Sequence, residues 1–496
     1  MKKRLSLMLI VIMAFNPIIS VGETFDADAD SNGTQTAAGY VRTVSLEEAQ
    51  DAAVAASVAI GAVKTERDQL VNTIADYNDK MEGLNALYEA LPAYETLYEK
   101  YTFTNSNPRY LQYFLYEQTL AELMAALASE TDPMVIAQIS AEIAATQTAM
   151  TALGLTESEI AGILTVEEAL YYQAYAEQFE KVGIADPNLS QKETYETFIE
   201  PMYVVPVQMN VGLQTYNLNI EVAENGIRLA TEKLYYGVLT LEKTGALAES
   251  RRSVSERELY EKRELYRLGK LSKKELDKVE NMYQMAVYQA ASAERKYESA
   301  MMNLKFLMGL SPEEKIALNE PESKEDTVET YSAATVPEEV LTSPATNRIE
   351  TSVLSLQISA KESELGYVAD YFSKNSDYYH SVEGELNALN IALKEAQYTI
   401  ETENVGAYNR VAEAFSDYEA AQFEYTVQVG DWEKVQTYAE QGLVTEFQVM
   451  QAELLLSQKK VALDKSRYDW MVSTDQLKFS LETGPGFDSE IGGTNE

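Results

Sequence analysis

The sequence of 496 residues contains no cysteine and a single histidine, His380. The lack of cysteine excludes disulfide bonds, catalysis by a thiol and a lipid anchor on an N-terminal cysteine. A lone histidine is more often a surface residue than a catalyst or a metal ligand. The sequence also has no Ser–His–acid set, phosphate-binding loop, zinc-ligand spacing or dinucleotide fingerprint. We therefore predict that the protein is not an enzyme and has no catalytic residues, no cofactor and no metal site.

Basic residues are scarce, because 40 Lys and Arg residues stand against 79 Asp and Glu residues. The net charge of −39 argues against nucleic acid and anionic membrane surfaces as partners. It is compatible with a solvated exterior or with an aqueous path that favours cations. The solvated exterior is the preferred interpretation.

Long apolar runs are limited to the start of the chain, where residues 1–22 read MKKRLSLMLIVIMAFNPIISVG. A basic segment, an apolar stretch and small residues follow one another, which is typical of a signal peptide cleaved after Gly22. The alternative, a membrane anchor, is disfavoured because the run is short for a span. The acidic, turn-rich residues 23–44 are predicted to be a flexible lead.

Proline is absent between Pro206 and Pro312, and again between Pro344 and Pro485. Apolar residues recur there in alternating steps of three and four, the heptad pattern of packed helices. The stripe in residues 211–268 predicts a helix about 90 Å long, which must pack against equally long partners. Its many alanines suit a helix with neighbours on two sides, as in a wall; the alternative is a two-stranded coiled coil. The next helix carries the stripe Leu276, Val279, Tyr283, Ala286, Ala290, Ala293, Tyr297, Ala300, Leu304 and Leu307.

Two stretches, residues 266–310 and 438–484, repeat one pattern at a constant offset of 173 residues. A glycine is followed three positions later by a hydroxyl residue, and three positions further on by Glu or Gln. Glycine can end one helix in a left-handed conformation, and Ser-x-x-Glu or Thr-x-x-Gln is a capping box that starts the next. The sequence therefore predicts two copies of a helix–turn–helix hairpin. The residues are Gly269, Ser272 and Glu275 in one copy and Gly442, Thr445 and Gln448 in the other.

The remaining segments are assigned around this duplication. A helix begins at Ser45 with a capping box of its own. The predicted fold is all-α or nearly so, with long antiparallel hairpins in an internal duplication and an inserted small helical domain. The segments are 45–79 and 207–310 for the first repeat, 80–206 for the inserted domain, 311–346 for an acidic strap, 347–484 for the second repeat and 485–496 for a polar tail.

The order of these features resembles the TolC-like outer-membrane efflux protein family. The resemblance covers residues 45–75 and 207–484 and rests on the duplication, on SLEEAQDAAVAAS and on NRIETSVLSLQISAKESELGYVADYF. These two stretches begin the two halves, and Ile349 stands where the family usually has proline. A Tyr-x-x-Gly turn, followed by a long Ala-rich helix that ends at Met308-Gly309, is also similar.

The resemblance implies a homotrimer in which each chain gives two hairpins to a twelve-helix, tunnel-forming assembly. It also implies an exported protein of the cell envelope, at the outer membrane, that works with a periplasmic-type adaptor (a membrane fusion protein) and an inner-membrane pump. Such a protein passes small molecules or polypeptides outward. Family members contribute membrane-spanning β-strands from each half. Residues 373–382 are too short for two such strands, which need about nine to eleven residues each, so these strands are predicted to be reduced or absent.

By the same resemblance, the hairpin turns are the tips of the tunnel that dock the adaptor. The predicted docking residues are Gly269, Leu271, Ser272, Gly442, Leu443 and Thr445. Leu271 and Leu443 are expected to be exposed and to supply apolar contact. A second class of function stays open, an exported coiled-coil scaffold or adhesion protein of the envelope that conducts nothing. A monomer or dimer in solution would favour this alternative, whereas a trimer would favour the tunnel.

Overall fold

The computed structural model describes residues 42–321 and 346–484 of the chain. The fold described here is that of the unit that begins at Thr43. The predicted signal peptide, nearly all of the acidic lead, the later part of the strap and the polar tail lie outside the described residues.

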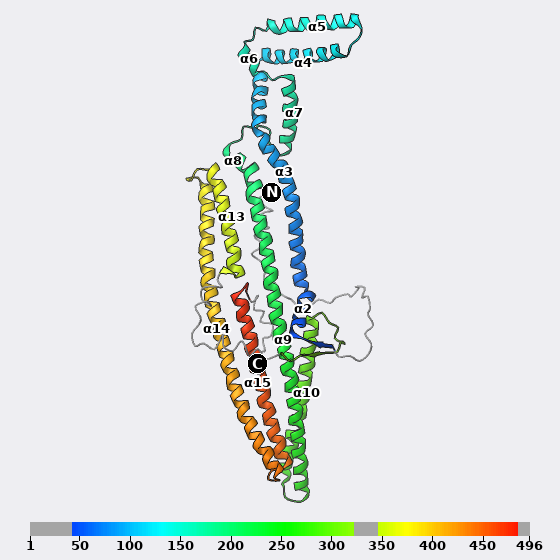
Figure 1. The fold of residues 1–496 in the computed structure, drawn as a ribbon, viewed down its shortest axis with the longest axis vertical. Coiled ribbons are helices and arrows are strands. Elements are labelled where there is room, and N and C mark those ends of the chain that lie inside the picture. Colours follow the sequence, from blue (N-terminus) through cyan, green and yellow to red (C-terminus); the bar gives the residue numbers. More distant parts are fainter. Residues whose placement is uncertain (1–41, 322–345, 485–496) are drawn as a thin grey trace. The chain divides into compact units, whose positions relative to one another are not determined.

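The described residues are almost entirely helical, so the prediction of a nearly all-α fold is confirmed (Figure 1). The first repeat contains α2 (Leu46–Ala56), α3 (Val58–Ser106), α9 (Val205–Arg267) and α10 (Lys273–Leu307). The second repeat contains α13 (Ile349–Tyr371), α14 (Asp377–Glu440) and α15 (Glu446–Leu481). Between α3 and α9 lie α4 (Pro108–Ser129), α5 (Pro133–Ala152), α6 (Glu157–Gly162), α7 (Val166–Lys181), α8 (Gln191–Thr194) and the π-helix η1 (Tyr195–Val204). Two short strands, β1 (Arg42–Val44) and β2 (Ile316–Leu318), form a two-stranded sheet.

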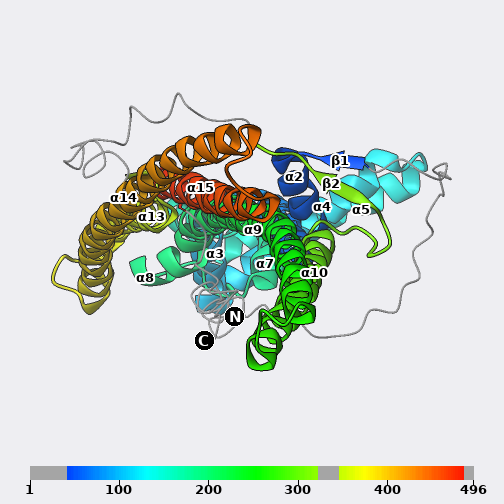
Figure 2. The same ribbon diagram turned by 90° about the horizontal axis from the view of Figure 1, so that it is seen from below.

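Helix α9, with 63 residues, is the central element of the two repeats. It packs against α10 of its own hairpin and against α15 of the other, while α15 packs in turn against α14. The four helices therefore follow one another as a row, α10–α9–α15–α14 (Figure 2). A helix with long neighbours on two sides was expected for a wall, and the two-stranded coiled coil is excluded for α9.

The main hydrophobic core lies where the two repeats meet. Tyr235, Tyr236 and Leu239 of α9 are buried there against Leu304 of α10 and Tyr468 of α15. The rings of Tyr236 and Tyr468 stack with centroids 4.9 Å apart. The stripe predicted for α10 is confirmed, because each of its ten positions is buried or half-buried against neighbouring side chains.

The second hairpin has its own seam between α14 and α15. Trp470 of α15 packs against Phe415 and Tyr418 of α14, with ring centroids 5.3 and 5.5 Å away. Val411 and Leu477 are fully buried beside these rings. Large aromatic side chains of both helices therefore hold the second hairpin together.

The helix that begins at Ser45 differs from the prediction in two ways. The capping box at Ser45 is present, but the helix stops at Ala56. The backbone at Ser57 is extended, with ψ of 110°. The Ser57 hydroxyl accepts a hydrogen bond from the Ile60 N–H at 3.3 Å and so caps the next helix, α3. Helix α3 then runs through residue 80 and through Pro92 to Ser106 without a break. Serine can cap a new helix, which explains the break at Ser57. Because α3 has no break near residue 80, the first repeat continues into the insertion as one helix.

The link between α13 and α14 is as short as expected, since it spans only residues 372–376. Helix α14 begins earlier than predicted, because the Ser376 hydroxyl accepts from the Tyr379 N–H at 3.2 Å and caps it. His380 therefore belongs to the first turn of α14, and its Nδ1 lies 3.4 Å from a carboxylate oxygen of Glu383. The histidine is an exposed helical residue with an acidic neighbour one turn along.

Candidate docking tips and the strap anchor

The two hairpin turns, here called the first tip (residues 267–274) and the second tip (residues 440–447), have the same backbone. Gly269 and Gly442 both have φ of 69°, the left-handed conformation that glycine adopts at little steric cost. Lys270 N–H donates to Leu265 O and Leu443 N–H donates to Tyr438 O, each at 2.9 Å. These bonds close Schellman motifs that satisfy carbonyls at the ends of α9 and α14.

Each tip starts its second helix with the predicted capping box. In the first tip, Glu275 N–H donates to Ser272 Oγ at 3.2 Å, and Ser272 N–H donates to the Glu275 carboxylate at 3.0 Å. In the second, Gln448 N–H donates to Thr445 Oγ1 at 3.3 Å, and Thr445 N–H donates to the Gln448 side chain at 2.8 Å. Hydrogen bonds from the Ser272 hydroxyl and backbone lower the pKa of Glu275. Gln448 has no charge to titrate, so only the first cap depends on pH.

The expectation that Leu271 is exposed is wrong. Leu271 is half-buried and packs on the apolar cluster of Leu259, Leu276 and Val279 at the end of the first hairpin. Val444 is its counterpart at the offset of 173 residues and is half-buried as well. Leu271 therefore turns back onto its own hairpin and stabilises the first tip, and neither side chain faces solvent freely.

The exposed apolar side chains of the tips are Leu268 and Leu443. Leu443 is 68% exposed, as expected, and Leu268 is 56% exposed. Their counterparts across the repeat are polar, Gln441 for Leu268 and Lys270 for Leu443. Each tip thus presents one exposed leucine, at different steps of the same turn. The sequence prediction missed Leu268. The offset of 173 residues pairs Leu271 with Val444 and Leu443 with Lys270, so it already indicated that Leu271 and Leu443 are not counterparts.

The tips also differ in charge. The first tip carries four basic residues and no acidic one, whereas the second carries two acidic residues and no basic one. Arg257 of α9 forms an ion pair with Glu446 at the start of α15, with 2.9 Å between nitrogen and oxygen. Glu446 is largely exposed and Arg257 partly so, and solvent therefore screens the pair and leaves it little stability to contribute, but it joins the two hairpins near their tips. The charged tip residues are Arg267, Lys270, Lys273 and Lys274 in the first and Glu440 and Glu446 in the second.

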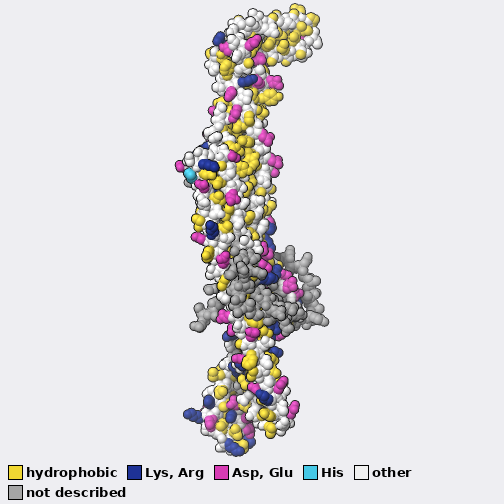
Figure 3. All heavy atoms as spheres, turned by 60° about the vertical axis from the view of Figure 1, so that its left-hand side comes forward, with side chains coloured by type: hydrophobic (Ala, Val, Ile, Leu, Met, Phe, Trp, Pro, Cys, Tyr) yellow, Lys and Arg dark blue, Asp and Glu magenta, His cyan; other side chains and the backbone are white. Residues whose placement is uncertain are grey.

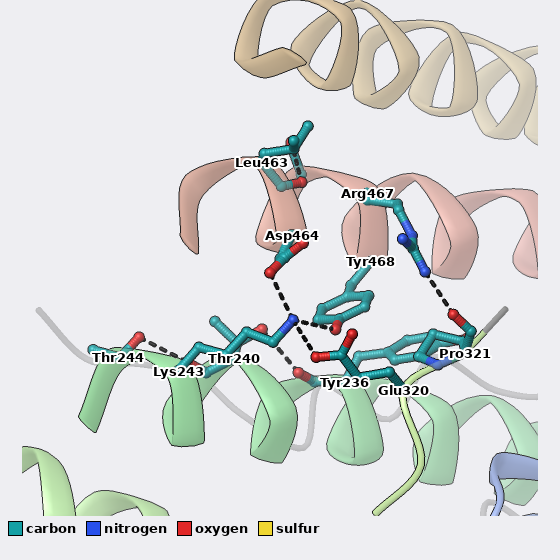
Figure 4. Close-up of polar contacts among 11 residues, drawn as sticks. Tyr236, Thr240, Lys243, Thr244, Glu320, Pro321, Leu463, Asp464, Arg467 and Tyr468 are labelled. Atoms are coloured by element: carbon teal, nitrogen blue, oxygen red, sulfur yellow. Dashed lines mark hydrogen bonds and ion pairs between the residues drawn. The ribbon is translucent and has the colours of Figure 1, made fainter. Parts of the chain in front are cut away.

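A second polar site, the strap anchor, fastens the start of the strap across both repeats (Figure 4). The Lys243 ammonium of α9 lies 2.6 Å from Asp464 of α15 and 2.8 Å from Glu320 of the strap, and donates to the Tyr468 hydroxyl at 3.2 Å. Burial alone disfavours the charged amine, but the hydrogen bonds to Asp464, Glu320 and Tyr468 outweigh it and raise the pKa of Lys243. The group is thus a charged cross-link between the repeats.

The strap anchor continues on either side of Lys243. Arg467 of α15 donates to Pro321 O at 2.7 Å, so two basic side chains hold the strap. Tyr235 OH lies 2.9 Å from Val44 O and 2.8 Å from Asn319 O, which places the strap beside the segment that enters the first repeat. The start of the strap therefore contacts both hairpins at the place where α9 packs against α15.

The far end of the strap region is fixed by Arg348. Its guanidinium is buried and lies 2.7 Å from Glu350 and 3.1 Å from Glu403 of α14. Ile349 N–H donates to Thr483 O at 3.1 Å, so the start of α13 meets the end of α15. These contacts hold the second repeat together at the start of α13, whereas the strap anchor joins the second repeat to the first.

Within residues 42–321 and 346–484, no group of three or more His, Cys, Asp or Glu side chains is arranged to hold a metal ion. In the same residues, no helix is both long enough and apolar enough to cross a membrane. All of the predicted site residues lie at the two hairpin tips. The strap anchor is a separate site, which the sequence did not indicate.

No family model matches this chain, and no curated protein matches it. Several solved structures are similar to it. The CmeC outer membrane channel of Campylobacter jejuni is 12% identical, covers 59% of this chain and 69% of its own, and has a TM-score of 0.42. A membrane protein from Pseudomonas aeruginosa is 10% identical, over 56% of this chain and 74% of its own, with a TM-score of 0.43. The outer membrane protein VceC of Vibrio cholerae is 13% identical, over 58% and 77%, with a TM-score of 0.40.

Proposed function

We propose that the protein is an exported subunit of a helical efflux tunnel, in which three copies close a ring and pass small molecules or polypeptides through the cell envelope. A periplasmic-type adaptor and an inner-membrane pump are the proposed partners. The proposal rests on the doubled hairpin, on the residues that resemble the TolC-like family, and above all on the open edges of the helical row.

The two outer helices of the row leave large apolar side chains uncovered. Met285 and Tyr288 of α10 are 61% and 71% exposed, and Phe423 and Val427 of α14 are 70% and 50% exposed. Contiguous exposed apolar side chains of this kind mark an interaction surface. This observation carries the proposal, because the row has an exposed apolar edge on each side that nothing in the described chain covers.

The edges lie at opposite ends of the row, so a second copy can join α10 of one chain to α14 of the next. Such a head-to-tail contact either closes a ring or extends without limit. A ring of three copies would contain four helices from each chain, as the family resemblance implies. In such a ring the basic first tip of one copy would also lie beside the acidic second tip of the next, which favours this alternation electrostatically.

The tips are the proposed site of adaptor docking. Leu268 and Leu443 offer apolar contact beside turns whose backbones are rigidly set by glycine and capping boxes. The other predicted docking residues would act by shaping the turns; these are Gly269, Leu271, Ser272, Gly442 and Thr445. The strap anchor would keep the two hairpins of one copy in a fixed relation while the tips bind.

The assembly can be tested by disulfide trapping, because the natural chain has no cysteine. Met285 lies 16 residues after Gly269, and Val427 lies 15 residues before Gly442, so both are at a similar distance from a tip. The double variant Met285→Cys, Val427→Cys should form disulfide-linked species of two and three chains under mild oxidation.

Each single variant serves as a matched control, since it lacks the opposite cysteine and should give no linked three-chain species. A double variant that stays a single folded chain after oxidation would contradict the ring. It would favour the alternative of a non-conducting envelope scaffold or adhesion protein.

A further inference from the structure

Helices α4 and α5, here called the arm, take no part in the row or its tips. They pack against each other, and α4 also contacts α3 and α7. On each helix the half-buried side chains recur in steps of three and four, which is the seam of a two-stranded hairpin. No residue of either helix is buried. The seam positions are Tyr113, Tyr116, Leu120, Leu123 and Leu127 of α4 and Ile136, Ile139, Ile143, Thr146 and Met150 of α5.

The arm lies at the end of the row opposite the tips. Helix α3 runs beside α9, as the Lys64–Glu224 ion pair at 3.0 Å and the hydrogen bond from Tyr77 OH to Pro201 O at 2.9 Å show. Pro201 precedes the start of α9, whose other end is the first tip. Beyond Tyr77, α3 continues to Ser106, a further length of about 45 Å at 1.5 Å per residue. The arm follows directly after Ser106 and therefore stands well beyond the start of α9.

The surface of the arm is poor in charge, and large apolar side chains are exposed among its uncharged polar ones. Leu115 and Met124 of α4 are 50% and 53% exposed, and Met134 of α5 is 83% exposed. Hydrophobic side chains gather over this end of the molecule (Figure 3). Exposed large apolar side chains that lie close together mark an interaction surface, so these residues of the arm are available for a partner. Its charged residues, among 22 in α4 and 20 in α5, are Arg109, Glu117, Glu122 and Glu142.

We propose that the arm is a self-association surface, and that its cover is the arm of a neighbouring copy of this chain. The inference rests on the ring proposed above. In that ring every copy holds its arm at the same end, so the arms share one small volume and meet at a high effective concentration. The second arm covers the half-buried seam and the exposed Leu115, Met124 and Met134.

Charge favours a second copy as the occupant. Copies of a chain with a net charge of −39 repel one another wherever acidic surface meets acidic surface. The arm is the part of the chain where helices of this length carry the fewest charges, with Glu142 alone in α5. Identical arms can therefore approach closely, and the many alanines of α5 let helix backbones pack tightly.

A lipid surface is a poorer occupant for the same helices. Helices that lie in a membrane interface carry Lys and Arg on their polar face and aromatic residues at the boundary. Helix α5 has no basic and no aromatic residue, and α4 has a single basic residue, Arg109, at its start. The aromatic residues of α4, which are Tyr110, Tyr113, Phe114 and Tyr116, are half-buried, and the arm lacks the basic residues that hold a helix at lipid headgroups.

The test again uses the absence of natural cysteine. Single variants Ala125→Cys on α4 and Ala141→Cys on α5 place a thiol on exposed alanines of the arm. Ala75→Cys, on the part of α3 beside α9, is the matched control on an exposed alanine away from the arm. Under mild oxidation of the full mature chain, both arm variants should form disulfide-linked pairs, and the control should not.

A second set of variants separates a specific contact from chance collisions. Adding Leu115→Glu and Met134→Glu to Ala141→Cys should abolish the linked pair while light scattering still reports a trimer. A trimer whose arm cysteines never link, or link no faster than Ala75→Cys, overturns the arm inference and leaves the tunnel proposal standing. A monomer overturns both. Flotation of the chain with phosphatidylcholine vesicles, lost on the same Glu substitutions, overturns it in favour of lipid.

Discussion

The two tips share one backbone and present different side chains. Gly269 and Gly442 have the same φ, and Ser272 and Thr445 cap their helices in the same way. Yet the first tip is basic and the second acidic, and the exposed leucine sits before the glycine in one and after it in the other. The residues that set the turn have been kept in both copies, whereas the residues that face outward have diverged. The turn is therefore a common scaffold, and in the proposed docking the side chains that differ would carry recognition.

The strongest test of this comparison removes both exposed leucines. Leu268→Asp together with Leu443→Asp should abolish adaptor binding and export, because a charged side chain replaces the apolar contact at each tip. Circular dichroism and light scattering should show unchanged helix content and assembly, since both leucines are largely exposed. Gln441→Asp, at the counterpart of Leu268, is the matched control and should leave export intact. Undiminished export by the assembled double variant would exclude the tips as the docking site.

A smaller effect, on the free energy of unfolding, is expected from the difference in burial between Leu271 and Leu443. Leu271→Asp should lower the free energy of unfolding by about 1–3 kcal/mol, because it puts a carboxylate against Leu259, Leu276 and Val279. Leu443→Asp should change it by no more than about 0.5 kcal/mol, as an exposed substitution normally does. Urea titrations of the two variants measure the difference. Equal losses of stability would show that Leu271 is as free of contacts as Leu443.

The glycines should respond alike, which tests whether the scaffold is truly common. Gly269→Val and Gly442→Val should each cost about 1–2 kcal/mol, since a side chain is strained in the left-handed region. Gly430→Ala lies inside α14 with open space around the added methyl group, and should stabilise the helix by up to about 1 kcal/mol. A substitution that costs one tip nothing would mean that this tip can reverse the chain in another conformation.

The caps give the smallest effect and a difference in pH response. Ser272→Ala and Thr445→Ala should each cost about 1 kcal/mol. The pKa of Glu275 is lowered in the folded chain, so its contribution is present above its ordinary value of 4.5 and is lost as pH falls through the folded value. Gln448 does not titrate. Hydrogen-exchange protection of the first tip should therefore fall in acid more than that of the second, and parallel losses would contradict the assignment.

The comparison also shows what the sequence could predict. The turns were predictable because glycine, Ser272 and Glu275 act within a few residues of one another, and the stripes of α10 were predictable because heptad spacing is local. Leu271 was misjudged because its burial depends on Leu259, which lies on the preceding helix. The break at Ser57 was missed because serine is tolerated in a helix as well as at a cap.

The strap anchor lay beyond sequence reasoning for a different reason. Lys243 and Asp464 are 221 residues apart, and each is one of many charged residues on long helices. No local pattern distinguishes them from solvated side chains. Only the packing of α9 against α15 brings Lys243, Asp464 and Glu320 together, and burial then makes their charges interdependent. The fold class was thus accessible from periodicity, while the contacts that fix one hairpin on the other were not.

The central claim is that the open row α10–α9–α15–α14 closes with two further copies into a ring. Native mass spectrometry of the protein measures this most directly. The account predicts a single dominant species with three times the mass of the chain, which persists at low protein concentration because both edges of every row are covered. A stable, well-folded monomer with Met285 and Phe423 open to solvent would contradict it.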